Sequence, residues 1–364
     1  MTGLLPEGFH DRLPPFADAA TRLERRVLDA AFLHGYEQVD PPLVEFEAAL
    51  QRRLKAGGAR DSVRFVDPAS QATLAIRPDI TAQVGRIAAT RMGHHPRPVR
   101  LSYAGPVVRL RASQLRPERA QRQIGCELIG RDTVAAAREV VSVAVEALQA
   151  AGMTGLSIDF TLPDLLAELA GDLPADRLAA LRQSLDGKDA AGVAAIDPAF
   201  LSLIEAAGPF DAALARLRAS VHGPALATRL DGLAEIAAAV PADIAMTLDP
   251  TERHGFEYQS WLGFSLFQVG VPVEVGRGGT YTILHDDGAE EPAVGFSLFA
   301  DALLDAGVGP VERRRLFVPV DADPAAAAAL RAEGWVTVAA LEEQDSPAAQ
   351  LCTHILTAEG PKPA

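Results

Sequence analysis

The segment 101–130, LSYAGPVVRLRASQLRPERAQRQIGCELIG, decides the fold of this 364-residue chain. Read at period two, it contains two strands joined by a polar loop over residues 113–121, which predicts an antiparallel hairpin. One face of the hairpin holds Val107, Arg109 and Arg111 from the first strand and Gln123, Gly125 and Glu127 from the second. The opposite face holds Val108, Leu110, Ile124, Cys126 and Leu128 and is apolar enough to join a core.

The first of these faces presents a guanidinium, an amide and a carboxylate around a residue without a side chain. A glycine between two polar groups leaves a floor open for a ligand, so the pattern is compatible with a binding site. It is equally compatible with a hairpin whose polar face is only solvated. The pattern by itself leaves both interpretations open.

The composition is that of a folded protein with more than one domain. A chain of 364 residues exceeds the usual size of one core, and its 48% hydrophobic residues can fill two or three. Many of these residues are alanines, which indicates helix-rich parts. The two cysteines, Cys126 and Cys352, lack metal-ligand spacing and are too few for a disulfide framework, so we expect a reducing, cytoplasmic setting.

Charge and hydropathy argue against two classes of partner. No apolar run approaches the ~18 residues of a membrane span, and the N-terminus lacks the basic and apolar regions of a signal peptide, so we expect no membrane association. The net charge of −14 argues against nucleic acid, because phosphate backbones are bound by clustered Lys and Arg. The densest basic run is Arg109, Arg111, Arg116, Arg119 and Arg122.

The pattern along the chain predicts three parts. Helices and strands mix through residues 1–163 and 241–310, which we expect to form one core in which the glycine-rich residues 276–279 make a turn. Residues 164–240 are rich in alanine and leucine at helical spacing and are interpreted as an inserted helical module. Residues 311–364 predict a small α/β domain in the order strand, helix, strand, helix, strand, with a frayed end over 361–364.

Six motifs, in this order, resemble those of histidyl-tRNA synthetase, a class II aminoacyl-tRNA synthetase. They cover roughly residues 4–305 and are LLPEGFHDRLPP (4–15), GYEQVDPPLVE (35–45), IRPDIT (76–81), YAGPVVRLR with RQIGCELIG (103–130), RHGFEYQS (253–260) and PAVGFSLFADAL (292–303). The resemblance implies an α+β fold: an antiparallel sheet of six to seven strands flanked by helices, with a helical insertion. It also implies a self-dimer through the segment around Pro42.

The resemblance further implies a histidine pocket. Asp79, where the family has glutamate, and Thr81 would hold the α-ammonium group, and Arg109 and Gln123 would hold the carboxylate. Glu127 would accept a hydrogen bond from the imidazole, and Tyr258 would line the pocket. His254, Gln259 and Tyr281 are further candidates for the lining. A buried zwitterion needs such charge-assisted partners at both ends, because unpaired buried charge costs several kcal/mol.

The nucleotide end departs from the synthetase pattern. The family holds ATP through R-x-E, a phenylalanine that stacks on adenine, and an arginine in its third motif. The corresponding positions here are Arg111 for the acidic residue, Gln121 for the phenylalanine and Ala302 for the arginine. The catalytic arginine position matches His254, with Arg253 one residue away, and a tyrosine of that element is replaced by Gln259. Adenylation needs positive groups placed on the phosphates, so we expect that activity to be lost.

A kept amino-acid pocket beside a lost ATP site resembles the regulatory subunits of short-form ATP phosphoribosyltransferase, which are paralogues of the synthetase. That resemblance implies a subunit of histidine biosynthesis with no catalytic residues, metal or cofactor of its own. It would assemble with a short catalytic subunit into a hetero-octamer, activate it and confer feedback inhibition by histidine. The short tail agrees, because the synthetase carries an anticodon-binding domain of ~100 residues.

Simpler interpretations stay open at this point. Asp79 and Thr81 follow Pro78 and could only cap a helix, while Arg109 and Glu127 could form an ion pair across the hairpin. Two other functions also remain: an active histidyl-tRNA synthetase-like amino-acid ligase with an unusual ATP site, and a nucleic-acid-binding module that uses the arginine run 109–122.

Overall fold

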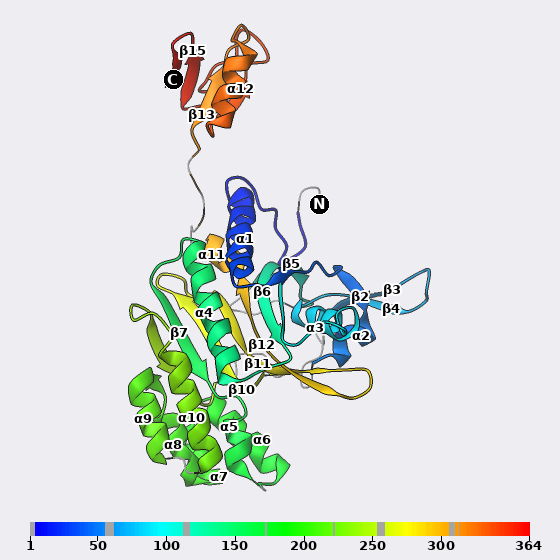
Figure 1. The fold of residues 1–364 in the computed structure, drawn as a ribbon, viewed down its shortest axis with the longest axis vertical. Helices are drawn as coiled ribbons and strands as arrows, with labels where there is room; N and C mark the ends of the chain where they lie inside the picture. Colours follow the sequence, from blue (N-terminus) through cyan, green and yellow to red (C-terminus); the bar gives the residue numbers. More distant parts are fainter. Residues whose placement is uncertain are drawn as a thin grey trace. The chain divides into compact units, whose positions relative to one another are not determined.

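A nine-stranded sheet forms the centre of the larger part of the chain (Figure 1). The computed structural model describes residues 4–54, 62–111, 117–171, 173–220, 223–252, 259–305, 309, 311 and 313–364. The chain divides into two compact units, residues 1–309 and 310–364. The hairpin read from segment 101–130 lies inside the sheet of the first unit.

The strands of the large sheet lie in the order β1-β5-β6-β12-β11-β10-β7-β9-β8. Their bounds are β1 (Glu37–Gln38), β5 (Val99–Val108), β6 (Ala120–Ile129), β7 (Leu156–Thr161), β8 (Gly208–Pro209), β9 (Ala245–Leu248), β10 (Gln259–Gln268), β11 (Gly276–Leu284) and β12 (Glu290–Phe299). The pairs β1–β5 and β7–β9 are parallel and the other neighbouring pairs are antiparallel. The expected antiparallel class II sheet is confirmed, with more strands than the six to seven implied, because two-residue strands β1 and β8 end it.

Both faces of the sheet are buried, which explains why β6 carries buried residues on each side. Its apolar residues Ile124, Cys126 and Leu128 belong to the same core as the helices α1 (Phe16–Leu33) and α4 (Val134–Ala150). The helix α4 begins after Thr133, whose hydroxyl accepts the backbone N–H of Ala136 at 3.4 Å. Each fully buried Val or Leu side chain contributes roughly 1.5–3 kcal/mol to such a core.

Helix α3 (Thr81–Thr90) packs on the other face of the sheet. Helix α11 (Ala300–Asp305) follows β12. A helical module lies at the end of this unit that is remote from α1 (Figure 1). The helices of the module are α5 (Leu165–Ala170), α6 (Ala175–Asp186), α7 (Ala190–Ile196), the 3-10 turn η1 (Pro198–Phe200), α8 (Leu201–Glu205), α9 (Phe210–Ser220) and α10 (Pro224–Ala237). The module joins the sheet through β8 and through Lys188, whose ammonium lies 2.6 Å from a carboxylate oxygen of Asp249.

A separate small sheet has one apolar face that no described element buries. It consists of β2 (Val44–Phe46), β4 (Thr73–Ile76) and β3 (Val63–Val66) and packs its other face on α2 (Glu47–Arg52) through Ala75 and Leu50. The pairing places six apolar side chains on the first face: Val44, Ile76 and Val63 in one row and Phe46, Leu74 and Phe65 in the next. None of the six is buried, and Phe46 is 51% and Phe65 is 43% exposed.

The second unit is a four-stranded sheet in the order β14-β13-β15-β16 with one helix. Its elements are β13 (Arg315–Val318), α12 (Pro324–Ala332), β14 (Val336–Ala339), β15 (His354–Thr357) and β16 (Gly360–Pro363). The expected second helix does not form, because 340–353 is a series of turns in which Asp345 accepts the backbone N–H groups of Leu341 and Glu342. The expected frayed end is also wrong, since β16 pairs with β15.

Two local expectations in the larger unit are corrected. Residues 276–279 are not a turn but the first half of β11, held between β10 and β12. Glycine suits this strand because a Cβ on Gly278 would collide with the ring of Phe264. Leu110 does not join the core and is 41% exposed, whereas Val107 is buried at 2%, because Leu110 lies beyond the end of β5.

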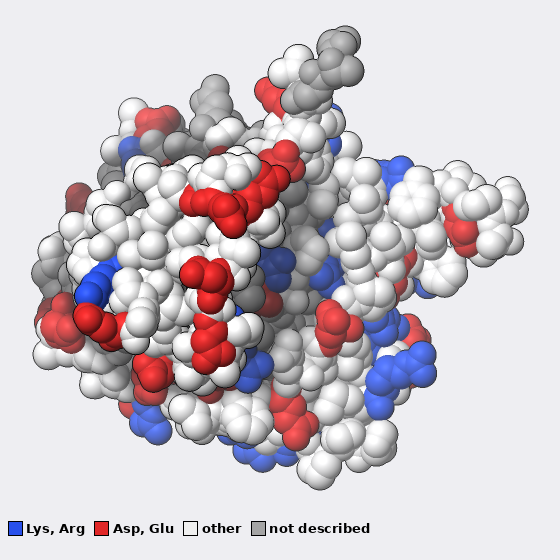
Figure 2. All heavy atoms as spheres, turned by 90° about the horizontal axis from the view of Figure 1, so that it is seen from above, with Lys and Arg blue, Asp and Glu red and all other residues white. Residues whose placement is uncertain are grey.

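Acidic and basic side chains are interspersed over the face shown in Figure 2. In the arginine run, Arg122 binds Glu24 with Nε at 2.8 Å from Oε2, and Arg119 lies 4.8 Å from the ring centre of Phe9. Two arginines of the run are therefore held by contacts within the chain. None of the helices in the described part of the chain is long and apolar enough to cross a membrane.

Candidate ligand-binding pocket

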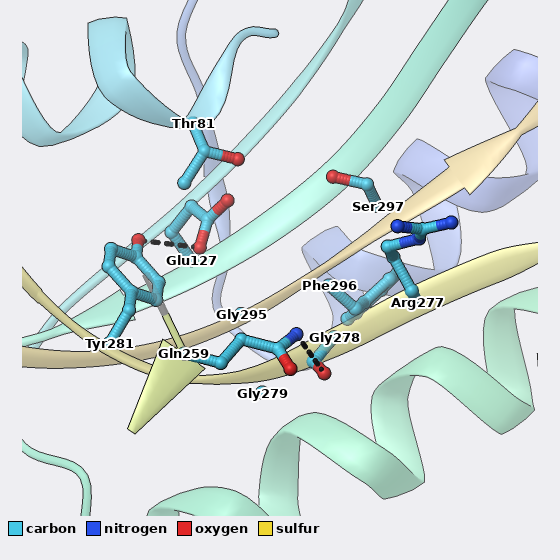
Figure 3. A pocket seen from close by; sticks show the side chains of 10 residues that line it. All are labelled: Thr81, Glu127, Gln259, Arg277, Gly278, Gly279, Tyr281, Gly295, Phe296 and Ser297. Carbon is cyan, nitrogen blue, oxygen red and sulfur yellow. Dashed lines mark hydrogen bonds between the residues drawn. The ribbon is translucent and has the colours of Figure 1, made fainter. Parts of the chain in front are cut away.

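A polar pocket lies over the middle strands of the large sheet, beside α3 (Figure 3). Its empty space amounts to about 250 Å³, a volume that includes the part open to solvent. Strands β6, β10, β11 and β12 and the start of α3 supply its walls. The lining residues are Thr81, Glu127, Gln259, Arg277, Gly278, Gly279, Tyr281, Gly295, Phe296 and Ser297.

The carboxyl group of Glu127 is the central polar group of this pocket. The side chain is 1% exposed and accepts hydrogen bonds from Tyr281 at 2.7 Å and from Tyr103 at 3.0 Å. Burial raises the pKa of Glu127 to about 8, although the two tyrosine hydroxyls act in the opposite direction. At pH 7 the carboxyl is therefore largely protonated, and it can exchange hydrogen-bond roles with a titratable ligand.

Glycines keep the pocket open. A Cβ on Gly295 would collide with the carboxylate of Glu127, and Gly278 and Gly279 complete the same floor. Gly125 plays a different part from the one expected, since a Cβ there would collide with Tyr103. The missing side chain of Gly125 thus makes room for a tyrosine rather than for a ligand.

A hydrogen-bond network connects the start of α3 to the pocket. The Gln123 amide donates to Asp79 at 3.0 Å and to Ser297 at 2.7 Å, and its oxygen accepts the backbone N–H of Ile80 at 3.0 Å. The other oxygen of Asp79 accepts the backbone N–H of Thr81 at 2.7 Å. Asp79 thus makes the local contact of a helix start and also joins the network around the pocket.

Four of the residues predicted from the sequence line the pocket: Thr81, Glu127, Gln259 and Tyr281. Asp79 and Gln123 do not line the pocket but bind residues that do. Asp79 accepts the backbone N–H of Thr81, and Gln123 donates to the hydroxyl of Ser297. Arg109 is not among the lining residues; its backbone N–H donates to Arg119 at 2.8 Å. Tyr258 and His254 lie outside the described residues.

Sequence reasoning missed three residues of this region. Tyr103 contacts Glu127, Ser297 and Thr81 through its hydroxyl, at 3.0, 3.0 and 3.2 Å. The period-two pattern that singled out Val107 would have reached Tyr103 if it had been extended four residues back. Nothing in the sequence pattern singles out Ser297 or Arg277, because they come from strands far from 101–130 in the chain.

The residues at the positions where the synthetase family binds ATP lie close to other side chains of this chain. Asp301, next to Ala302, binds the guanidinium of Arg12 and accepts the backbone N–H of Arg122 at 2.6 Å. Gln121, at the adenine-stacking position, is 7% exposed, and its side-chain oxygen has no hydrogen-bond partner among the described residues. Among the residues that the structure describes, no group of three or more His, Cys, Asp or Glu side chains could hold a metal ion.

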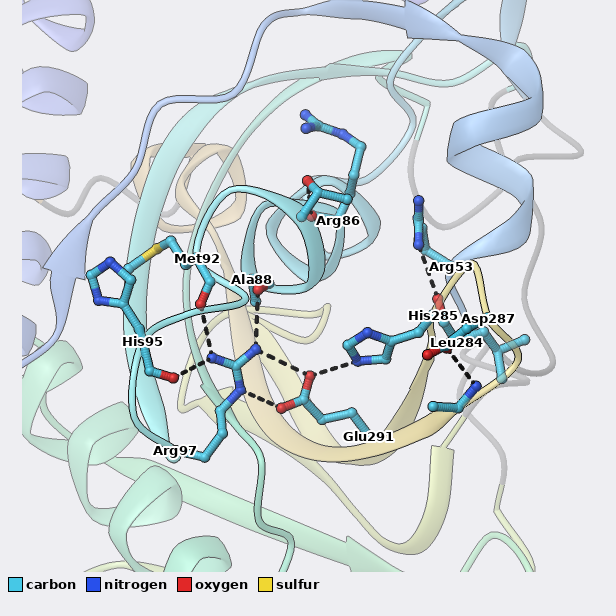
Figure 4. Close-up of polar contacts among 12 residues, drawn as sticks. Arg53, Arg86, Ala88, Met92, His95, Arg97, Leu284, His285, Asp287 and Glu291 are labelled. Carbon is cyan, nitrogen blue, oxygen red and sulfur yellow. Dashed lines mark hydrogen bonds and ion pairs between the residues drawn. The ribbon is translucent and has the colours of Figure 1, made fainter.

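A second cluster of polar side chains lies near the turn between β11 and β12 (Figure 4). Arg97 pairs with Glu291 and also donates to the carbonyl groups of Ala88, Met92 and His95 at 3.0–3.1 Å. Because Ala88 and Met92 lie at the end of α3, the guanidinium satisfies carbonyls that the helix leaves unpaired. The cluster anchors α3, and so the position of Thr81, to the sheet.

Comparison with known proteins agrees with this architecture. The family model described as histidyl-tRNA synthetase matches residues 8–303. An ATP phosphoribosyltransferase regulatory subunit from Paramagnetospirillum magneticum is 42% identical over 370 aligned residues, covering 98% of this chain and 97% of the relative.

Two solved structures share the fold. An ATP phosphoribosyltransferase regulatory subunit/histidyl-tRNA synthetase from Bacillus halodurans has a TM-score of 0.79 at 22% identity, covering 98% of this chain and 100% of that one. A chain of the ATP phosphoribosyl transferase (HisG:HisZ) complex from Thermotoga maritima has a TM-score of 0.60 at 18% identity, covering 77% of this chain and 97% of that one. The high identity to a full-length regulatory subunit, together with the match over most of the chain, shows that this chain belongs to the family of ATP phosphoribosyltransferase regulatory subunits, within the histidyl-tRNA synthetase-like class II proteins.

Proposed function

We propose that this chain assembles with a short-form ATP phosphoribosyltransferase catalytic subunit, activates it and transmits feedback inhibition by histidine. As a member of its family the chain is a regulatory subunit that acts in histidine biosynthesis and does not catalyse the reaction itself. The observation that carries the feedback role is the pocket around Glu127, which keeps its polar groups while the ATP positions are replaced.

The chemistry of the pocket suits histidine. Glu127 has a pKa of about 8 because it is buried, so its carboxyl group and a nearby imidazole can share a proton in either direction. Asp79 and Thr81 would bind the α-ammonium group, Gln123 would lie at the carboxylate end, and Tyr258 would complete the lining. Arg109, to which the resemblance gave the carboxylate, is not among the lining residues. An analogue without the ring N–H would lose its hydrogen bond to the Glu127 carboxyl, which would then keep only its contacts with Tyr281 and Tyr103, and this loss gives selectivity for histidine.

Replacement of the nucleotide positions supports a role without adenylation. Ala302 and Gln121 supply neither a guanidinium nor an aromatic ring, and Asp301 is bound to Arg12 and to the backbone of Arg122. An active ligase would need positive charge on the phosphates at this place. Purified chain incubated with histidine, ATP and labelled pyrophosphate should therefore show no isotope exchange, and clear exchange would restore the ligase alternative.

Feedback requires that histidine bind one state of the assembly better than another, typically by about 1–3 kcal/mol. The test is the catalytic subunit reconstituted with this chain, assayed with and without histidine. Glu127→Ala should weaken the response to histidine while co-purification and activation persist. As a control, Glu235→Ala removes an exposed carboxylate that pairs with Arg138 on the surface and should change neither property. Unchanged inhibition in the Glu127 variant would contradict this site.

The uncovered face of the small sheet supports a self-dimer near Pro42. The six apolar side chains defined above lie in two rows, beside the segment of Pro41 and Pro42, whose carbonyls are bound by Arg77 and Gln83 at 2.7 and 2.8 Å. A second copy would bury this face, and two dimers with four catalytic subunits would give a hetero-octamer in the cytoplasm.

Adjacent residues of β3 provide a matched test of that dimer. Phe65→Asp should shift the chain toward monomer in light scattering, because it places a charge on the apolar face. Val66→Asp places the same charge on the opposite face of the strand, where the side chain is 61% exposed, and should leave the mass unchanged. Equal masses for the two variants would contradict the proposed interface.

A further inference from the structure

The pocket has an ionisable side chain at each end, Glu127 at one and Arg277 at the other. Tyr281, Gly279 and Arg277 alternate along β11 and so share one face of the strand. Tyr281 holds the carboxyl group of Glu127, and the guanidinium of Arg277 lies beside Ser297 on the far side of the pocket (Figure 3). At a strand rise of about 3.4 Å per residue, the Cα atoms of Tyr281 and Arg277 are about 14 Å apart, which leaves room between their side chains for a small zwitterion.

Contacts behind the pocket fix the position of Arg277. Its guanidinium pairs with Glu274 and lies 5.7 Å from the ring centre of Phe299, and Glu274 also accepts a hydrogen bond from Ser265 at 3.2 Å. Phe299 is 3% and Glu274 is 8% exposed, so this support is itself part of the core. A planar guanidinium can bind two carboxylates through different edges, so the pair with Glu274 is compatible with a second anion in the pocket.

Arg109, the guanidinium assigned to the carboxylate by resemblance, does not line the pocket, whereas Arg277 does. We propose that Arg277 binds the carboxylate of the amino-acid ligand and gives the pocket its preference for amino acids over analogues without that group. This inference rests on the proposed histidine sensing and adds the residue that sets its specificity. Ser297, which accepts a hydrogen bond from the Gln123 amide at 2.7 Å, would position the carboxylate end of the ligand as well.

Calorimetric titration of the full chain with two ligands tests the assignment. Histidine and histidinol share the imidazole and the amine, but histidinol has a hydroxymethyl group in place of the carboxylate. The native chain should bind histidine at least about 10-fold more tightly than histidinol, as expected for a charge-assisted contact. Arg277→Met should remove that difference by weakening histidine alone, with histidinol affinity unchanged within about 2-fold.

Three further variants separate the alternatives. Arg277→Lys should recover part of the preference for histidine, because it keeps the charge but not the planar geometry. The double variant Glu274→Gln, Arg277→Met removes both charges of the buried pair and should bind the two ligands as Arg277→Met does. Equal behaviour would show that the effect of Arg277→Met does not come from misfolding around the unpaired carboxylate of Glu274. Arg109→Met should leave both affinities unchanged.

Three outcomes of these titrations would overturn the assignment of Arg277. Equal losses for histidine and histidinol in the Arg277 variants would show a structural role and overturn the proposal. Loss of the preference in Arg109→Met but not in Arg277→Met would overturn it in favour of Arg109. A native chain that binds neither ligand would overturn the histidine pocket itself, and the assignment of Arg277 with it.

Discussion

The substitution Glu127→Gln should change how the stability of the larger unit depends on pH. The native carboxyl group has a pKa of about 8, whereas the same group in the unfolded chain has a value near 4.5. Because the pKa is raised in the folded state, the unfolded chain loses its proton first as pH rises. The folded state is therefore destabilised progressively between about pH 4.5 and pH 8, and the effect is constant outside this interval.

The size of the effect follows from the same interval. Each pH unit corresponds to 1.36 kcal/mol, so the full interval amounts to about 5 kcal/mol of stability, of which about 3 kcal/mol is lost by pH 7. Glutamine cannot ionise, so the variant should not lose this stability. It should become more stable relative to the native chain as pH rises from 5 to 8, less a constant cost for one altered tyrosine hydrogen bond.

Thermal unfolding from pH 5 to pH 8.5 measures this difference. At roughly 2 °C per kcal/mol for a unit of this size, the midpoints of the two chains should diverge by about 10 °C across the interval. Glu139→Gln is the matched control: the hydrogen bond from Arg100 lowers the pKa of Glu139, so the stability from its charge is present above pH 4.5 and is lost only below. Parallel midpoints for the native chain and Glu127→Gln would refute the buried, protonated carboxyl.

Three other substitutions should show graded effects on unfolding. Gly295→Ala should destabilise the larger unit by about 3 kcal/mol or more, because the new Cβ would collide with the carboxylate of the pocket; Gly187→Ala, which meets only an ordinary contact, should cost little in the same urea titration. Arg97→Met should cost about 3 kcal/mol and increase hydrogen exchange at the end of α3, since three carbonyls and a carboxylate lose their donor, and unchanged exchange would contradict that role. Lys188→Met should cost less than about 1 kcal/mol, because the ammonium is 35% exposed, and a larger loss would show that the helical module depends on this one contact.

Much of the architecture follows from local pattern. The alternation in 120–129 correctly placed Ile124, Cys126 and Leu128 in a core and Glu127 on the polar face of the hairpin. Residues 134–150 have apolar residues at helical spacing and form α4, and the alternating residues 156–161 form β7. Such patterns succeed because period two and period 3.6 record which side of an element is buried.

The local pattern failed where a residue's role depends on distant neighbours. Residues 276–279 have turn composition, yet they lie in a central strand, where Phe264 and the backbone of β12 leave no space for a side chain at Gly276 or Gly278. The end of the chain, expected to fray, instead forms β16 and pairs with β15 across a short turn. Neither pairing partner can be read from the segment itself.

The amino-acid sequence by itself determined the family, the polar face of the hairpin and the loss of the ATP positions, because these are properties of residue type and order. The tertiary structure decided that Tyr281, Ser297 and Arg277 line one pocket with Glu127, and that Arg109 is not among the lining residues. The reason is that β6 pairs with β12, a segment more than 150 residues away in the chain, and β12 brings β11 and β10 with it. Burial among those strands also sets the protonation of Glu127, which no sequence period encodes.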